Sequence, residues 1–218
     1  MRTNPFYDAL LFITGQAGDY DPFGASRYLL VLLYDGLLLA SIAIAITNLR
    51  QDRSQRSVRH AVIWLFRVLI GSMWLQGSLW KLPLPVSDGF LYWQQQTVEN
   101  AAFPFYAAIM RDVFLAHINL LDPAVYLTET FMAAALILGF AVRLAGMVGV
   151  AMTLNLWIGL YHNQAEWPWE YIFLVVTSGF FVLDRAGRSL GLDALLPRRY
   201  PFLASGRSLL GNAHRLAS

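Results

Sequence analysis

The chain has 218 residues, of which 57% are hydrophobic and only 14% are charged, and its mean hydropathy is +0.47. Because soluble domains carry roughly 25% charged residues, this composition predicts an integral membrane protein. The absence of cysteine excludes disulfides, Cys-ligated iron–sulfur or zinc sites and palmitoylation. The net charge of +2 does not indicate nucleic-acid binding, since the basic residues lie in loops between apolar runs.

The chain begins with an arm, residues 1–26, that mixes polar and aromatic residues and lacks the basic-then-apolar order of a cleavable signal peptide. Five later segments approach the roughly 20 apolar residues that cross a bilayer. These predicted spans cover about residues 27–49, 61–82, 123–142, 145–161 and 167–183. Their apolar runs are continuous rather than alternating, which favours helices over barrel strands. We therefore expect an all-α membrane protein.

The positions of lysine and arginine predict its orientation, because cytoplasmic loops carry the excess of basic residues. Eleven basic residues would share one side of the membrane and four the other. The eleven are Arg50, Arg53, Arg56, Arg59, Arg143, Arg185, Arg188, Arg198, Arg199, Arg207 and Arg215, and the four are Arg2, Arg27, Lys81 and Arg111. We expect the N-terminus outside, with the basic loop 50–60 and the tail 197–218 on the cytoplasmic face.

The longest stretch between spans, residues 83–122, is expected outside. Within it, residues 103–121 have apolar side chains near helical spacing, interrupted by Arg111, Asp112 and His117. This pattern predicts an amphipathic helix lying in the outer interface.

Three charged residues lie inside the predicted spans: Asp35, Arg67 and Glu129. A charge at this depth costs a few kcal/mol or more, so such residues usually pair or bind something polar. Asp35 can form a helix-packing hydrogen bond, reach Arg67 or Arg27, or contact a partner subunit. For Arg67 the alternatives are a polar interior site and snorkelling toward the cytoplasmic side.

The second span carries a polar stripe. Its members recur every three or four residues and so share one helix face: Arg67, Gly71, Trp74, Ser78 and Lys81. Lys81 ends this span on the outer side, where it can snorkel to headgroups or pair with Glu129 of the third span. Such a pair has two interpretations, a structural lock between helices or a polar pocket with a proton-accepting group. The four histidines lie outside the middle of the spans, and no metal site is predicted.

The sequence resembles the DoxX/DoxD family of small bacterial membrane proteins over roughly residues 61–196. The resemblance is carried by R-x₃-G-x₅-G-x₃-K, then E-x₉-G-x₃-R, then a last span ending in LDRAGRSLGLDALL. The matching positions are Arg67, Gly71, Gly77, Lys81, Glu129, Gly139, Arg143, Gly191 and Asp193. The resemblance implies a DoxX-like four-helix transmembrane bundle in the bacterial inner membrane. This chain adds an N-terminal transmembrane helix, residues 27–49.

The resemblance also implies a function, because family members are described as a subunit of a thiosulfate:quinone oxidoreductase or as membrane partners of redox enzymes. The first hypothesis is therefore a redox-linked subunit without its own electron-carrying cofactor, which receives electrons from partner proteins. Its quinone would bind among Arg67, Trp74, Gln76, Lys81 and Glu129, with Glu129 and Lys81 as candidate proton relays. The alternative is a structural subunit that anchors a larger membrane complex through Asp35 and the added helix. A carrier ranks last, since no repeat or broken helix is visible.

Overall fold

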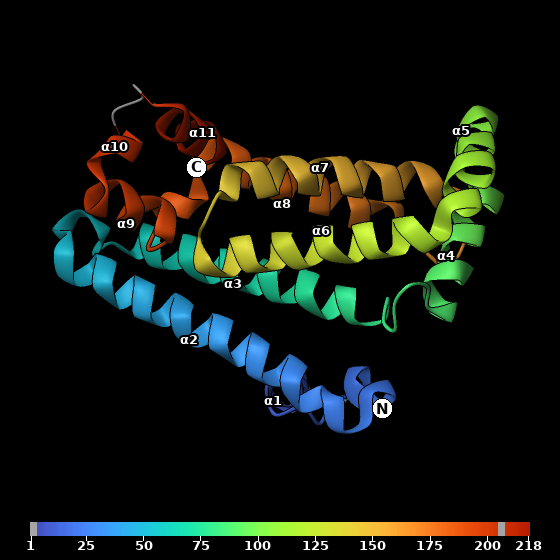
Figure 1. Cartoon of the computed structure of the whole chain (residues 1–218), viewed down its shortest axis with the longest axis horizontal. Helices are drawn as coiled ribbons and strands as arrows, with labels where there is room; N and C mark the ends of the chain where they lie inside the picture. The colour runs from blue at the N-terminus through green and yellow to red at the C-terminus, as the bar shows by residue number, and fades with distance from the viewer. Residues whose placement is uncertain (1–3, 205–207) are drawn as a thin grey trace.

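The computed structural model describes residues 4–204 and 208–218, and over these residues it contains helices and no strand. Five long helices run along the long axis of the molecule (Figure 1). They are α2 (Arg27–Gln51), α3 (Val58–Leu79), α6 (Ile118–Leu138), α7 (Val142–Gly159) and α8 (Pro168–Asp184). Each corresponds to one predicted apolar segment, which confirms the all-α expectation.

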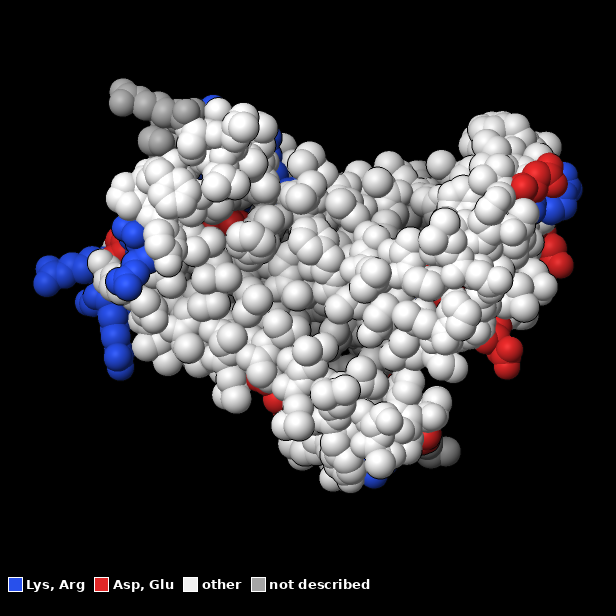
Figure 2. Space-filling model, viewed as in Figure 1, with Lys and Arg blue, Asp and Glu red and all other residues white. Residues whose placement is uncertain are grey.

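Four helical stretches in the described part of the chain are long and apolar enough to cross a membrane, consistent with a multi-pass membrane protein. They contain α2, α3, α6 and α7. The fifth long helix, α8, has 17 residues, or roughly 26 Å at 1.5 Å per residue. Figure 2 shows a mostly uncharged middle, with basic side chains gathered at the end near α9 and acidic side chains mainly at the end near α4 and α5. This distribution suits a molecule whose middle lies in lipid.

The bundle is built from α3 packed against α6 and α7 packed against α8, with α6 against α7 joining the two pairs. Its core includes Trp74, Leu75, Met132 and Phe181. The α3–α6 contact is close because Gly71 has no side chain: a Cβ there would lie 2.8 Å from Ile137 Cγ1. Small residues at helix crossings allow this approach.

The added helix α2 lies beside α3 and α6 and diverges from the bundle toward its N-terminal end (Figure 1). Ser41 of α2 donates a hydrogen bond of 2.6 Å to the carbonyl of Ile137. The predicted arm forms α1 (Pro5–Ile13) and a 3-10 segment, η1 (Gly18–Ser26), that pack at the diverging end. There the ring of Phe12 lies 5.1 Å from Tyr20 and 5.2 Å from Tyr34 between ring centroids.

The stretch between α3 and α6 differs from the expected loop and single amphipathic helix. It contains α4 (Asp88–Glu99), α5 (Pro104–Ile109), a π-helical turn (Met110–Phe114) and a 3-10 turn (Leu115–His117). The π turn inserts an extra residue into the helical path, so the apolar pattern of residues 103–121 is divided among short pieces. Asp122, expected outside in the loop, lies buried within α6 and accepts a hydrogen bond of 3.0 Å from Ser87 N.

At the opposite end, the turn from α6 to α7 is held by the chain that follows α8. Gly139 occupies the left-handed region at φ 70°, which suits glycine. Asp193, near the start of α9 (Leu192–Arg199), accepts hydrogen bonds from Ala141 N at 2.8 Å and Val142 N at 3.1 Å. A distant carboxylate thus caps the start of α7. The tail continues as α10 (Pro201–Ala204) and α11 (Leu209–Ala217).

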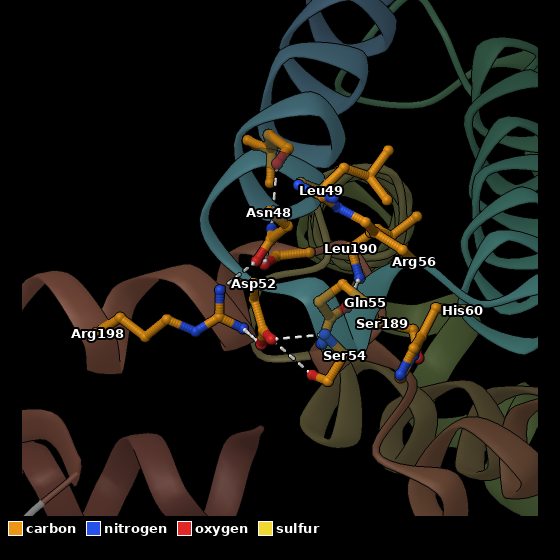
Figure 3. Close-up of polar contacts among 12 residues, drawn as sticks. Asn48, Leu49, Asp52, Ser54, Gln55, Arg56, His60, Ser189, Leu190 and Arg198 are labelled. Atoms are coloured by element: carbon orange, nitrogen blue, oxygen red, sulfur yellow. Dashed lines mark hydrogen bonds and ion pairs between the residues drawn. The ribbon is translucent and has the colours of Figure 1, made fainter.

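The basic loop 50–60 is tied to the same region through the polar contacts drawn in Figure 3. Gln55 accepts a hydrogen bond of 2.9 Å from Leu190 N, and Asn48 Nδ2 donates to the carbonyl of Gly191 at 3.1 Å. Arg198 forms an ion pair with Asp52 at 2.6 Å. The loop after α2 and the chain that follows α8 therefore meet at this end of the bundle.

Asp193 gives the fold a testable pH dependence, because burial raises the pKa of its carboxyl to about 6. The unfolded value is about 4, so the folded protein binds this proton more tightly. The Asp193 contribution to stability is therefore present below about pH 4 and is lost as pH rises through about 6. We expect the unfolding temperature of the wild type, measured relative to that of Asp193→Asn, to decrease as the pH is raised from about 4 to about 6. A constant difference across that range would contradict the assignment.

Candidate functional site

A cavity of about 370 Å³ lies inside the bundle near the α4 end, bounded by α3, α4, α6, α7 and α8. Its apolar walls include Trp74, Trp80, Phe90, Trp93, Leu156 and Tyr171. Its polar lining includes Lys81, Gln94, Thr97, Glu129 and Asn155. The volume and the mixture of aromatic walls with a few polar groups are typical of small-molecule sites.

Lys81 and Glu129 form a buried ion pair on the wall of this cavity. Lys81 Nζ lies 2.7 Å from Glu129 Oε2, and the two side chains are only 4% and 6% exposed. Lys81 Nζ also donates to the carbonyl of Gly77 at 3.0 Å and lies 3.9 Å from the centroid of the Trp80 ring. The structure thus shows the pairing that the sequence left open, and Lys81 does not snorkel to the surface.

Helix geometry explains why the two charges meet. Lys81 follows the last residue of α3 in a turn, where its backbone N–H donates to the carbonyl of Ser78 at 3.2 Å. Glu129 lies two turns along α6 from Asp122, so both acidic residues share one helix face directed into the bundle. Packing of α3 on α6 then brings the ammonium and the carboxylate together.

The helix α4 supplies cavity residues that sequence reasoning missed. It begins at Ser87, whose hydroxyl accepts a hydrogen bond of 3.0 Å from Phe90 N. Phe90, Trp93 and Thr97 from this helix line the cavity, and their spacing places them on one face. The cap at Ser87 followed by this spacing is the signal that could have predicted α4.

The lining of the cavity has an excess of negative charge. Besides Glu129, it includes Glu166 and Glu170 near the start of α8, whereas Lys81 is the one cation among the described residues that line it. Glu166 accepts a hydrogen bond of 2.8 Å from the hydroxyl of Tyr171. Because Lys81 is already paired with Glu129, the remaining carboxylates favour neutral or cationic ligands over anions.

Arg67 lies at the other end of α3, roughly 20 Å from Lys81 at 1.5 Å per residue. It is fully buried and donates hydrogen bonds to the backbone carbonyls of Leu136, Ile137 and Ser189. It thereby caps the end of α6 and joins it to the chain after α8. The structure places Arg67 outside the cavity and shows no snorkelling.

Gln76 and Asp35 also lie away from the cavity. Gln76 Nε2 donates to the carboxylate of Asp19 at 3.2 Å, on the side facing the N-terminal arm. Asp35 is half-buried on α2, and its Oδ1 is enclosed without a hydrogen-bond partner among the residues that the structure describes. Of the five residues predicted for one pocket, the fold brings together three: Trp74, Lys81 and Glu129.

A scan against protein-family models, a search of curated proteins and a search of solved structures each found no match. The resemblance to the DoxX/DoxD family therefore stays a prediction, and the function has to be argued from the cavity and its charges.

Substitutions at the ion pair test its place in the fold. Lys81→Met or Glu129→Leu alone leaves one buried charge unpaired, which costs about 3–5 kcal/mol. The double variant should lose much less, because no unpaired charge remains. Denaturant unfolding of the detergent-solubilised protein measures the three free energies. The exposed pair Arg111–Asp112 serves as a control, where Arg111→Gln should change stability little. If the double variant loses as much unfolding free energy as the two single variants together, the two residues do not form a buried ion pair.

Proposed function

We propose that the protein is an integral membrane subunit of a redox complex and binds a quinone in the cavity beside Lys81 and Glu129. The observation that carries this proposal is a buried ion pair on the wall of an aromatic cavity, and three of the helices that bound this cavity, α3, α6 and α7, are long and apolar enough to cross a membrane. A quinone combines a flat, neutral ring and two carbonyl oxygens with an apolar tail. An apolar cavity with one concentrated polar point suits such a molecule.

The ion pair offers both chemical functions that quinone reduction requires. The Lys81 ammonium has three N–H donors. One of them can leave its present acceptor and donate a hydrogen bond to a carbonyl oxygen of the quinone. The Glu129 carboxylate can accept and release a proton. Reduction to the quinol takes two electrons and two protons. The partner subunit supplies the electrons, and the proposal assigns the protons to a path through Glu129 and Lys81.

The negative charge of the cavity lining limits the kind of ligand that we assign to this chain. Thiosulfate is a dianion, and the carboxylates of Glu166 and Glu170 on the lining disfavour it. We therefore assign only quinone binding to this chain, and any oxidation of a sulfur anion to a partner subunit.

We also propose an orientation for the bundle in a bacterial inner membrane. The end bearing α9 carries most of the arginines, as Figure 2 shows for the visible face, which supports a cytoplasmic location for that end. The cavity then lies in the outer half of the membrane, and α8 is the fifth span. Arg2 and Arg207, which belong to the charge count, lie outside the described residues.

A specific observation also favours the second function, a structural subunit of a larger complex. The helix α2 contributes no residue to the cavity and exposes apolar side chains such as Leu29, Leu32 and Leu39. Asp35 lies on this helix with one enclosed oxygen that lacks a hydrogen-bond partner in the described part of the chain. A polar group of a neighbouring subunit would satisfy that oxygen.

A comparison of two acid-to-amide substitutions tests the quinone site. Glu129→Gln removes the charge beside Lys81 and should weaken binding of a short-chain benzoquinone about tenfold or more. Asp35→Asn makes the same chemical change outside the cavity and should leave the affinity unchanged. Binding is measured by calorimetry on the purified chain in neutral detergent.

The same two variants separate the proposed functions in native membranes. Glu129→Gln should abolish turnover of the complex while the partner subunits still co-purify, and Asp35→Asn should reduce their recovery. Equal quinone affinity in the wild type and in Glu129→Gln would overturn the quinone proposal.

A further inference from the structure

A second cavity, of about 510 Å³, lies at the end of the bundle opposite the quinone cavity. Its walls come from the loop after α2, the turn after α8, and the three helices of the tail, α9, α10 and α11. The polar side chains that line it are mostly cationic: Gln55, Arg185, Arg188, Arg198, His214 and Arg215. Figure 3 shows two of these, Gln55 and Arg198, from the side of the loop after α2.

Three of the four arginines that line this cavity lack an acidic partner among the described residues. Arg198 is neutralised by Asp52 at 2.6 Å, whereas Arg185, Arg188 and Arg215 form no ion pair with any acidic residue that the structure describes. Arg188 donates only a long hydrogen bond of 3.4 Å to Ser218 Oγ among its described contacts. Several guanidinium groups around one open cavity repel one another, and an anion bound among them would relieve that repulsion.

The one acidic residue on the lining, Asp193, is engaged elsewhere. Its two oxygens accept the backbone N–H groups of Ala141 and Val142, so the carboxylate serves the start of α7. The cavity therefore keeps an excess of positive charge.

His214 provides a second, independent indication of a missing ligand. Its side chain is only 10% exposed, and its Nε2 is buried without a hydrogen-bond partner within the described ranges. Asp193 Oδ1 lies 3.7 Å from this nitrogen, which is too far for a hydrogen bond. A buried imidazole nitrogen on the wall of a cationic cavity is satisfied when an acceptor enters the cavity.

We propose that this cavity binds a phosphate group, presented either by the headgroup of an anionic lipid or by a soluble phosphate compound. A phosphate carries up to two negative charges and several strong acceptor oxygens. Guanidinium groups bind such oxygens with paired hydrogen bonds, and His214 adds a further polar contact. A bound phosphate bridges the turn after α8 to α11 and so fixes the C-terminal helix on the bundle. This site is separate from the proposed quinone site and goes beyond that function.

Two variants matched in charge test the site on the full chain. Arg188→Gln combined with Arg215→Gln removes two guanidinium groups from the cavity. Arg50→Gln combined with Arg199→Gln removes two exposed arginines from the same end of the bundle but outside the lining. Circular dichroism verifies that both double variants remain helical. A third variant, His214→Phe, keeps every arginine and removes only the buried imidazole.

Two measurements distinguish the sources of the phosphate. Calorimetric titration of the detergent-solubilised chain with inorganic phosphate tests a soluble ligand. Native mass spectrometry with phosphatidylglycerol, compared with phosphatidylcholine, tests a lipid headgroup. In at least one of them we expect saturable binding that weakens about tenfold or more for each cavity arginine removed. His214→Phe should weaken it as well, and the Arg50/Arg199 double variant should bind like the wild type.

Saturation with inorganic phosphate would identify a soluble ligand, and binding of phosphatidylglycerol alone would identify a lipid headgroup. Either supports the proposal. No binding of either probe, or equal losses in the two arginine double variants, would overturn it, because general attraction between cations and anions would then explain the data.

Discussion

The bundle depends on the requirement that charges buried between its helices be satisfied by other groups of the protein. The Lys81–Glu129 pair meets this requirement between α3 and α6, at 2.7 Å and almost without exposure. Burying such a pair costs desolvation of both groups, which their attraction repays only when the geometry is good. Two well-packed apolar side chains would hold these helices together equally well. A polar pair kept on the wall of a cavity is therefore better explained by a ligand than by stability alone.

The same requirement is met differently at the other end of the bundle. Arg67 donates to the carbonyls at the end of α6, and Asp193 accepts from the amides at the start of α7. Arg67 contacts the C-terminal end of α6, and Asp193 contacts the N-terminal end of α7. Each charge therefore complements the dipole of the helix end that it contacts. Both groups hold helix ends together, so the quinone proposal rests on the other polar group of the interior, the Lys81–Glu129 pair on the cavity wall.

Composition and apolar length predicted the five long helices, because lipid imposes those two properties directly on the sequence. The position of Arg67 could not be predicted, since its partners are backbone carbonyls that leave no mark in the residue types. Gln76 was placed in the pocket as a hydrogen-bond donor for the quinone, but the rotation of α3 turns it toward Asp19. The helix α4 was missed because most of its residues are polar or aromatic, and only Phe90 and Thr97 are buried. The pairing of Lys81 with Glu129 required the crossing of α3 and α6, which the sequence does not specify.

Photolabelling with an azidoquinone, followed by mass spectrometry of the labelled peptides, is the decisive experiment for a quinone site between α3, α4 and α6. We expect crosslinks to cavity residues of α3, α4 and α6, such as Trp74, Trp93 and Glu129, and we expect unlabelled quinone to suppress them. Crosslinks confined to the exposed leucines of α2, or insensitive to unlabelled quinone, would contradict it.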